Sequence, residues 1–272
     1  MSISLSQTPL RFPLNPLSSR DGASPSRTDL PAIRLRRVGP RTTEEFIKVA
    51  ETRQERQAAF RLVHDIYVRS GLIEPQPSGM RVTRHHLADG TDVLIAKRGG
   101  RVSFTLTLVR DADQGLPLDS LFAREVRSMR AEGLRLAEVS CLANADRGGD
   151  RKRQFERFVG MISLALQAAR RRGVDRLLLA VHPRHARVYQ RMFGCAACSQ
   201  VKEYAAVRGN PAILCMHDFA RTDETRYPLY EKIYGPRYAP WQLDGARMAE
   251  AERRFFAGSV AADGGDFIPM AA

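Results

Sequence analysis

The sequence of 272 residues can form one large domain or one domain with extended ends, and its 43% hydrophobic content is that of a globular protein. Its 43 Lys and Arg outnumber 30 Asp and Glu, and the formal charge of +13 favours an acidic partner such as nucleic acid, an anionic membrane surface or an acidic carrier protein. No apolar run approaches the roughly 18 residues of a membrane span, and the N-terminus lacks the pattern of a secretory signal. We therefore expect a cytoplasmic protein whose four cysteines stay as thiols.

Composition divides the chain into three parts. Residues 1–40 are rich in Pro, Ser and Arg and have no sustained apolar period, which predicts a disordered basic arm. Residues 41–220 alternate between helical and strand patterns and should form the folded domain. Residues 221–272, rich in Tyr and Arg, should form a partly helical C-terminal extension.

The folded domain opens with a short strand pattern, and Thr52 is a suitable N-cap for the helix that follows it. Gly99 and Gly100 separate two β-rich runs, which predicts an antiparallel hairpin. The predicted elements of this half are a strand at 44–50, a helix at 52–71, strands at 91–97 and 101–110, and a helix at 119–133.

The next segment predicts a strand–helix–strand unit. A strand at 134–143 precedes a basic glycine loop at 144–153, a helix at 154–173 and a strand at 174–181 that should be fully buried. The crossover should be right-handed, so the two strands should be parallel. Two further strand patterns, at 199–207 and 212–220, straddle the turn Gly209–Pro211, so the sheet should be mixed.

The stretch "VHPRHARVYQRMFGCAAC", residues 181–198, contains two histidines and two cysteines. His182, His185, Cys195 and Cys198 have the ligand chemistry of a zinc site, and C-x2-C is a familiar zinc spacing. A helix pattern separates the histidines from the cysteines, however, and would carry the two pairs apart. We therefore expect no metal, while a zinc-stabilised interaction protein remains an alternative.

The same stretch resembles the final strand–helix corner of the GNAT superfamily of N-acyltransferases. Tyr189 lies five residues before Gly194, and with the preceding "PRH" this is closer to the N-acyl amino acid synthase family, which is related to the acyl-homoserine lactone synthases. The resemblance covers about residues 43–219. It includes "DGTDVLIAKRGG", "TLTLVRD" followed by "GLP", and "AEVSCLA", in that order along the chain.

The resemblance implies a GNAT-like fold: a mixed, splayed α/β sheet flanked by helices, whose centre holds an acyl thioester. The acyl group is then moved to a primary amine, and family relatives take long acyl chains from acyl carrier protein. The usual glycine-spaced pyrophosphate loop is replaced here by "RGGDRKR", residues 147–153. We therefore expect acyl carrier protein rather than coenzyme A as the carrier, and no tightly bound cofactor. The carrier would bind four basic residues: Arg147, Arg151, Lys152 and Arg153.

Glu138 is the expected general base, because in "AEVSCLA" it matches the acidic residue of the lactone synthase E-x-S segment. A structural, ion-paired Glu138 is the alternative. Ser140 could orient substrate, and Tyr189 could protonate the leaving thiolate or simply belong to the core. The strand residues able to line an acyl tunnel are Phe104, Leu106, Leu142 and Val181.

The amine acceptor should be an amino acid or similar small molecule, giving an N-acyl amino acid. An activity like that of the lactone synthases, or of an acyl-CoA-dependent GNAT enzyme, remains open. A nucleic-acid-binding module is a further alternative, but the basic residues are dispersed and no helix-turn-helix or finger pattern is present. Peripheral contact with an anionic membrane also suits the charge.

Overall fold

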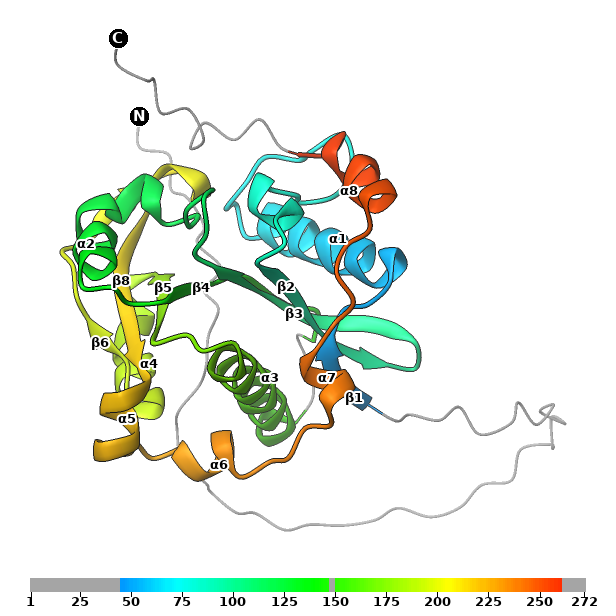
Figure 1. The fold of residues 1–272 in the computed structure, drawn as a ribbon. Coiled ribbons are helices and arrows are strands. Elements are labelled where there is room, and N and C mark those ends of the chain that lie inside the picture. The colour runs from blue at the N-terminus through cyan, green and yellow to red at the C-terminus, as the bar shows by residue number, and fades with distance from the viewer. Residues whose placement is uncertain (1–44, 147–149, 261–272) are drawn as a thin grey trace, which may run out of the picture. The chain divides into compact units, whose positions relative to one another are not determined.

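A mixed sheet of eight strands forms the centre of the described residues, 45–146 and 150–260, in this computed structural model (Figure 1). The strand order is β1-β2-β3-β4-β5-β8-β6, and β7 pairs with β8. β4 and β5 are parallel, as predicted, whereas the other paired strands are antiparallel. The strands are β1 Glu45–Val49, β2 Thr91–Arg98, β3 Arg101–Arg110, β4 Leu136–Asn144, β5 Arg176–Val181, β6 Ala196–Ala197, β7 Lys202–Tyr204 and β8 Asn210–Asp218.

Helices cover both faces of this sheet (Figure 1). Alternate residues of β4 show the two sides, because Leu136 packs with α2 and Ala137 packs with α3. α1 and α8 pack together on the α2 side, where Phe60 contacts Phe256. The helices are α1 Arg53–Arg69, α2 Asp119–Ala131, α3 Arg151–Arg171, α4 Pro183–Phe193, α5 Phe219–Thr225, α6 Tyr230–Tyr234, α7 Pro240–Leu243 and α8 Glu250–Ala257.

The first turns of α1 and α3 show how capping residues fix helix starts. Thr52 caps α1 as predicted, since its hydroxyl accepts a hydrogen bond from the Glu55 N–H at 3.2 Å. α3 begins at Arg151 rather than at 154, because the Asp150 carboxylate accepts from the Lys152 N–H at 2.9 Å. The expected loop of 144–153 is therefore too long, and Arg151, Lys152 and Arg153 lie in a helical turn.

The last part of the sheet also differs from the prediction. The strand expected at 199–207 is only Lys202–Tyr204, followed by a short 3-10 turn at Ala205–Val207. β8 starts earlier than expected, at Asn210, so Pro211 is its second residue. Proline is tolerated there because the start of a strand does not require every N–H donor.

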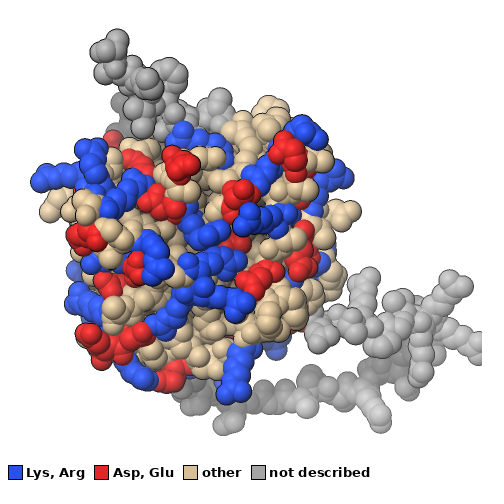
Figure 2. Space-filling view, in the orientation of Figure 1, with Lys and Arg blue, Asp and Glu red and all other residues tan. Residues whose placement is uncertain are grey.

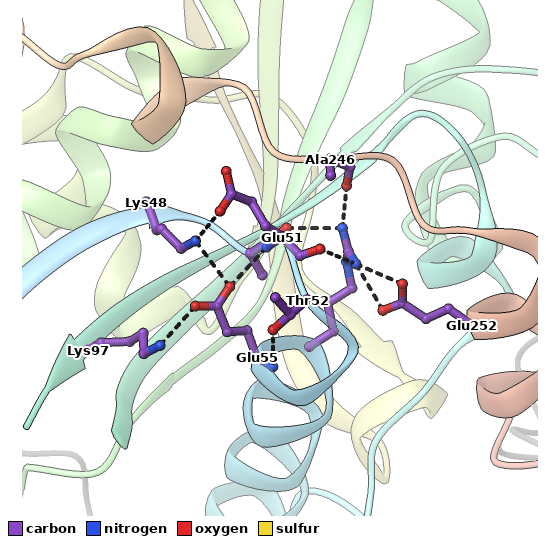
Figure 3. A network of polar contacts seen from close by, with 9 residues as sticks. Lys48, Glu51, Thr52, Glu55, Lys97, Ala246 and Glu252 are labelled. Carbon is purple, nitrogen blue, oxygen red and sulfur yellow. Dashed lines mark hydrogen bonds and ion pairs between the residues drawn. The ribbon is translucent and has the colours of Figure 1, made fainter. Parts of the chain in front are cut away.

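The C-terminal extension holds α5 to α8 and runs from the α3 face, past β1, to α1 (Figure 1). Arg56 on α1 anchors it. This buried guanidinium donates to the Ala246 carbonyl and to both Glu252 oxygens, at 2.9 and 3.0 Å, while it also bonds the Ala50 and Glu51 carbonyls (Figure 3).

Beside this anchor, Glu55 bonds Lys97 at 2.9 Å and lies 3.2 Å from Lys48 (Figure 3). Burial opposes the charged form of Glu55, but hydrogen bonds from the Glu51 N–H, Lys97 and Lys48 outweigh it and lower its pKa to about 2. The start of α1 is thus a charged network that is fully paired.

Candidate active site

The parallel strands β4 and β5 separate partway along their length. Their pairing runs from Leu136↔Arg176 to Glu138↔Leu178, and beyond this point β4 continues to Asn144 beside β3 while β5 continues to Val181 beside β8. We call this divergence the fork. α3 and α4 follow directly after β4 and β5, so both helices begin at the open end of the fork.

A β-bulge in β4 lies just beyond the last pair. Thr107 pairs with Ser140 and Thr105 pairs with Ala143, so Cys141 and Leu142 both lie opposite the single residue between them on β3. Cys141 has a positive φ of 51°, an uncommon conformation for a residue with a side chain. The bulge turns Cys141 toward α1, where it packs with Val63 and Ile66.

Glu138 occupies the last paired position before the fork. Its side chain is buried, with 2% of the residue exposed, and its Oε2 accepts a hydrogen bond from the Leu118 N–H at 2.8 Å. Among the groups that shift its pKa no Lys or Arg of the described residues is found, and its hydrogen-bond partner is a backbone N–H.

Burial raises the pKa of Glu138 to about 8. The charge of Asp119 raises it further, whereas the hydrogen bonds from Leu118 and from the Ser140 hydroxyl lower it. This carboxyl group can therefore both accept and release a proton near neutral pH. Ser140 lies two residues further along β4 and is half-buried.

Two tyrosines near Glu138 were not identified from the sequence. Tyr67 on α1 and Tyr204 on β7 both have pKa values raised mainly by burial. The charge of Cys141 also raises the pKa of Tyr67, which packs beside it, and the charge of Glu138 also raises the pKa of Tyr204. No motif marks them, because they come from segments far apart in the sequence.

Tyr189 approaches from the other face of the sheet, on α4. Its half-buried ring packs on Phe193 with 6.0 Å between ring centroids, and burial raises its pKa to about 12. It also contributes to the raised pKa of Tyr67, which lies on the opposite face. Tyr189 packs against the core beneath α3, on the face opposite to the cluster that holds Leu118, the partner of Glu138.

The predicted tunnel residues occupy two kinds of position. Phe104 and Leu106 are fully buried in the core beneath α3, where Phe104 stacks on Phe158 with centroids 6.4 Å apart. Leu142 and Val181 are only partly buried, and each lies beyond the last β4–β5 pair, on either side of the fork.

Three of the four basic residues expected to bind a carrier lie at the open end of the fork. Arg151, Lys152 and Arg153 are exposed on the first turn of α3, and Arg147 lies outside the described residues. Three exposed arginines that the sequence analysis did not single out lie along α4: Arg184, Arg187 and Arg191.

His182 caps α4 and His185 lies in its first turn, whereas Cys195 and Cys198 lie beyond its end. The helix therefore keeps the histidines away from the cysteines, and the part of the chain that the structure describes holds no group of three or more His, Cys, Asp or Glu suited to a metal ion. The four cysteines are thiols that form no disulfide with one another, and burial raises the pKa of Cys198 and of Cys215 to about 11. Within the described residues no helix is long and apolar enough to cross a membrane.

Comparison with known proteins gives the family. The profile described as N-acyl amino acid synthase FeeM matches residues 58–218, which is more than half of the chain. No curated protein sequence matches. Among solved structures, FeeM from uncultured soil microbes is 22% identical, with a TM-score of 0.58, and the match covers 70% of this chain and 99% of that one. This similarity extends to the overall fold.

Two other solved structures are more distant. An acyl-CoA N-acyltransferase from Pseudomonas aeruginosa is 19% identical, with a TM-score of 0.44 over 64% of this chain and 98% of that one. The acyl-homoserine lactone synthase LasI is 11% identical, with a TM-score of 0.48 over 72% and 98%. The profile match places this chain in the FeeM family of N-acyl amino acid synthases, and the protein is an acyltransferase.

Proposed function

We propose that this enzyme transfers a long-chain acyl group from acyl carrier protein to the amine of an amino acid, giving an N-acyl amino acid. The observation that carries the proposal is the position of Glu138, a buried carboxyl group with a raised pKa at the last β4–β5 pair before the fork. Amine acylation needs a base at such a position, because an ammonium ion cannot attack a carbonyl carbon.

In this mechanism Glu138 accepts the proton of the acceptor amine as its nitrogen attacks the thioester carbonyl. The new C–N bond forms, the C–S bond breaks, and the leaving thiolate takes a proton. Tyr189, whose raised pKa keeps its hydroxyl protonated near neutral pH, would give that proton and then regain one from solvent. Ser140, beside Glu138, would orient the acceptor.

The raised pKa of Glu138 has a consequence for the reaction. With a pKa of about 8, roughly a tenth of the molecules carry the ionised base at pH 7. The ionised fraction is small, but a more basic carboxylate is a better match for an amine proton. The enzyme should therefore become faster as the pH rises toward 8.

The donor would enter from the open end of the fork, between the first turns of α3 and α4. Arg151, Lys152 and Arg153 would bind acidic residues of the carrier there, and Leu142 and Val181 would contact the acyl chain. Each buried methylene contributes about 0.8 kcal/mol, which corresponds to a roughly fourfold gain in kcat/KM per methylene until the space is filled.

The experiment compares two donors, each bearing the same long acyl chain: acyl carrier protein and coenzyme A. The purified enzyme is incubated with each donor and a mixture of amino acids, and N-acylated products are measured by mass spectrometry. We expect products from the carrier, with a rate that falls as salt is added, because screening weakens the attraction between charged surfaces. Equal turnover with acyl-CoA, insensitive to salt, would refute the carrier, and absence of N-acyl amino acids with both donors would refute the acceptor class.

A further inference from the structure

One peptide group links Glu138 to a residue on another strand. The Leu118 N–H donates to Glu138 Oε2 at 2.8 Å, and the carbonyl of the same peptide, Pro117 O, accepts from the Tyr204 hydroxyl at 3.3 Å. Ser120 Oγ donates to that carbonyl as well, at 3.0 Å. The Pro117–Leu118 peptide therefore connects β7 to the carboxylate on β4.

This peptide needs external support because it precedes the regular part of α2. Leu118 is the cap residue, and Phe122, one turn later, has non-helical angles of φ −117° and ψ 31°. β7 supplies the support through two side chains. Tyr204 holds the Pro117 carbonyl, and Lys202 Nζ bonds the Leu121 carbonyl at 3.1 Å and Glu125 at 3.0 Å.

A hydrogen bond to a peptide carbonyl also makes the N–H of the same peptide group a stronger hydrogen-bond donor. Hydrogen bonds in a chain polarise one another, by perhaps 10–30% per bond. Tyr204 can act at every working pH, since burial, and then the charge of Glu138, keep its pKa well above its usual value. Its hydroxyl thus remains a donor while Glu138 gains and loses its proton.

We propose that Tyr204 is a positioning residue for Glu138: its hydroxyl, by donating to the Pro117 carbonyl, fixes and polarises the Leu118 N–H that binds the carboxylate. This inference rests on the proposed role of Glu138 as the base. Tyr204 itself touches neither the acyl donor nor the acceptor in this scheme, and acts only through the peptide.

Other groups that act on this carboxylate come from the elements packed around it. Asp119 on α2 raises the pKa of Glu138, although Asp119 is itself paired with Arg130 at 2.6 Å. Ser140 on β4 lowers the pKa of Glu138. Cys141 on β4 and Arg81 act on Tyr204. The Tyr204 hydroxyl also has a hydrogen bond with Ser120, whose own hydroxyl donates to the same Pro117 carbonyl, so removing the Tyr204 hydroxyl changes only groups on this peptide.

The test is the variant Tyr204→Phe, measured in two ways. The first is the pH dependence of kcat/KM. Loss of the polarising bond should move the limb near pH 8 upward by about half a pH unit, so that kcat/KM falls about threefold at pH 7 and recovers at pH 9. A loss of equal size at every pH would instead mean a structural role, or direct proton donation by Tyr204, and would overturn the proposal.

The second measurement does not depend on activity. The difference in thermal midpoint between a protein and its Glu138→Gln variant follows the titration of Glu138 in the folded state. In the native background this difference should level off once the pH exceeds the folded-state pKa of Glu138. In the Tyr204→Phe background it should level off at a pH about half a unit higher. An unmoved titration would overturn the proposal, whereas a moved titration without acyltransfer would leave it standing and refute only the proposed function.

Two further variants make the result specific. Tyr238→Phe is the matched control, because Tyr238 also donates to a backbone carbonyl, Gly160 O at 3.2 Å, but on the α3 face. It should move neither the rate limb nor the titration, and a shift of equal size there would overturn the proposal. Ser120→Ala removes the other donor to Pro117 O from an exposed position, so it should fold and move the titration in the same direction. If Tyr204→Phe does not fold, this variant decides, and an unmoved titration overturns the proposal.

Discussion

At the scale of single residues, the proposed chemistry depends on a buried carboxyl group. Glu138 has a backbone N–H as its partner, and burial raises its pKa to about 8 from an ordinary value of 4.5. A group of this kind binds its proton more tightly in the folded state than in the unfolded chain. Its contribution to folding is therefore complete below pH 4.5 and is lost as the pH rises through 8.

We predict opposite effects of Glu138→Gln on activity and stability. The chemical step should slow by roughly two to four orders of magnitude, because the base is lost while the shape is kept. The variant should also unfold at a higher temperature than the native protein at pH 9, with the difference shrinking as the pH falls. Turnover and thermal midpoints on the same samples check both. A folded variant with near-native turnover would show that Glu138 is not the base.

Gly194, at the end of α4, gives a second prediction at this scale. Its φ is +65°, and a Cβ there would lie 2.8 Å from the Tyr227 ring and 3.0 Å from the Thr222 methyl group. Gly194→Ala should therefore lose about 1–2 kcal/mol from the left-handed backbone and more from the clash. Gly133→Ala is the control, since Gly133 has a φ of +75° and open space around it. Equal losses of unfolding free energy in denaturant titrations would exclude the clash.

At the scale of elements, the C-terminal extension depends on one arginine. Arg56 on α1 is 5% exposed and bonds two carbonyls at the start of its own helix, the Ala246 carbonyl and the Glu252 carboxylate. This places the segment that leads into α8 against α1 (Figure 3). The extension is thus attached to the acyltransferase fold by a buried, charge-assisted contact in addition to apolar packing.

We predict that Arg56→Ala lowers the free energy of unfolding by about 3–5 kcal/mol, because Glu252 would be left partly buried without its partner. Arg61→Ala on the exposed face of α1 is the control and should change it by less than about 0.5 kcal/mol. Denaturant titrations measure both. Limited proteolysis should also cut the extension sooner in Arg56→Ala, and equal stability of the two variants would contradict the anchoring role.

At the scale of the whole molecule, the net charge of +13 does not make every surface uniformly basic. On the face shown in Figure 2, basic side chains are interspersed with acidic ones. The exposed cluster at the first turn of α3 differs, because three cations in sequence lie near the positive end of the helix dipole. Such a cluster is costly for the helix and attractive to an acidic partner.

We predict that replacing Arg151, Lys152 and Arg153 with Ser raises KM for the acyl carrier protein by roughly tenfold or more and flattens the salt dependence, with kcat unchanged. Stability should not fall, since the cations oppose the dipole. Replacing three exposed arginines elsewhere, Arg101, Arg124 and Arg127, removes the same charge and is the control. An equal rise in KM for the control would indicate a general charge effect instead of a docking surface.

The sequence determined the local elements and the family. The period of apolar residues predicted the helix after β4, and Thr52 predicted the start of α1, because hydrogen bonds and caps within a helix join residues only a few positions apart. The strand β5 was also predicted, but only its middle residues are buried, because its ends lie at the edges of the packed core. The order of motifs then indicated N-acyl amino acid synthases, and the place of Glu138 in one of them made it the expected base. Where the prediction was wrong, as at Arg151, the cap at Asp150 outweighed an unfavourable charge.

The tertiary structure alone decided what surrounds Glu138. Its partner Leu118 lies 20 residues earlier in the chain, and Tyr204 reaches the same peptide from a strand that the pattern placed only loosely. The bulge at Cys141 and the end of β4–β5 pairing depend on register between strands, which no local period records. A raised pKa needs burial from several elements at once, so the chemistry of the site arises only when distant segments pack together.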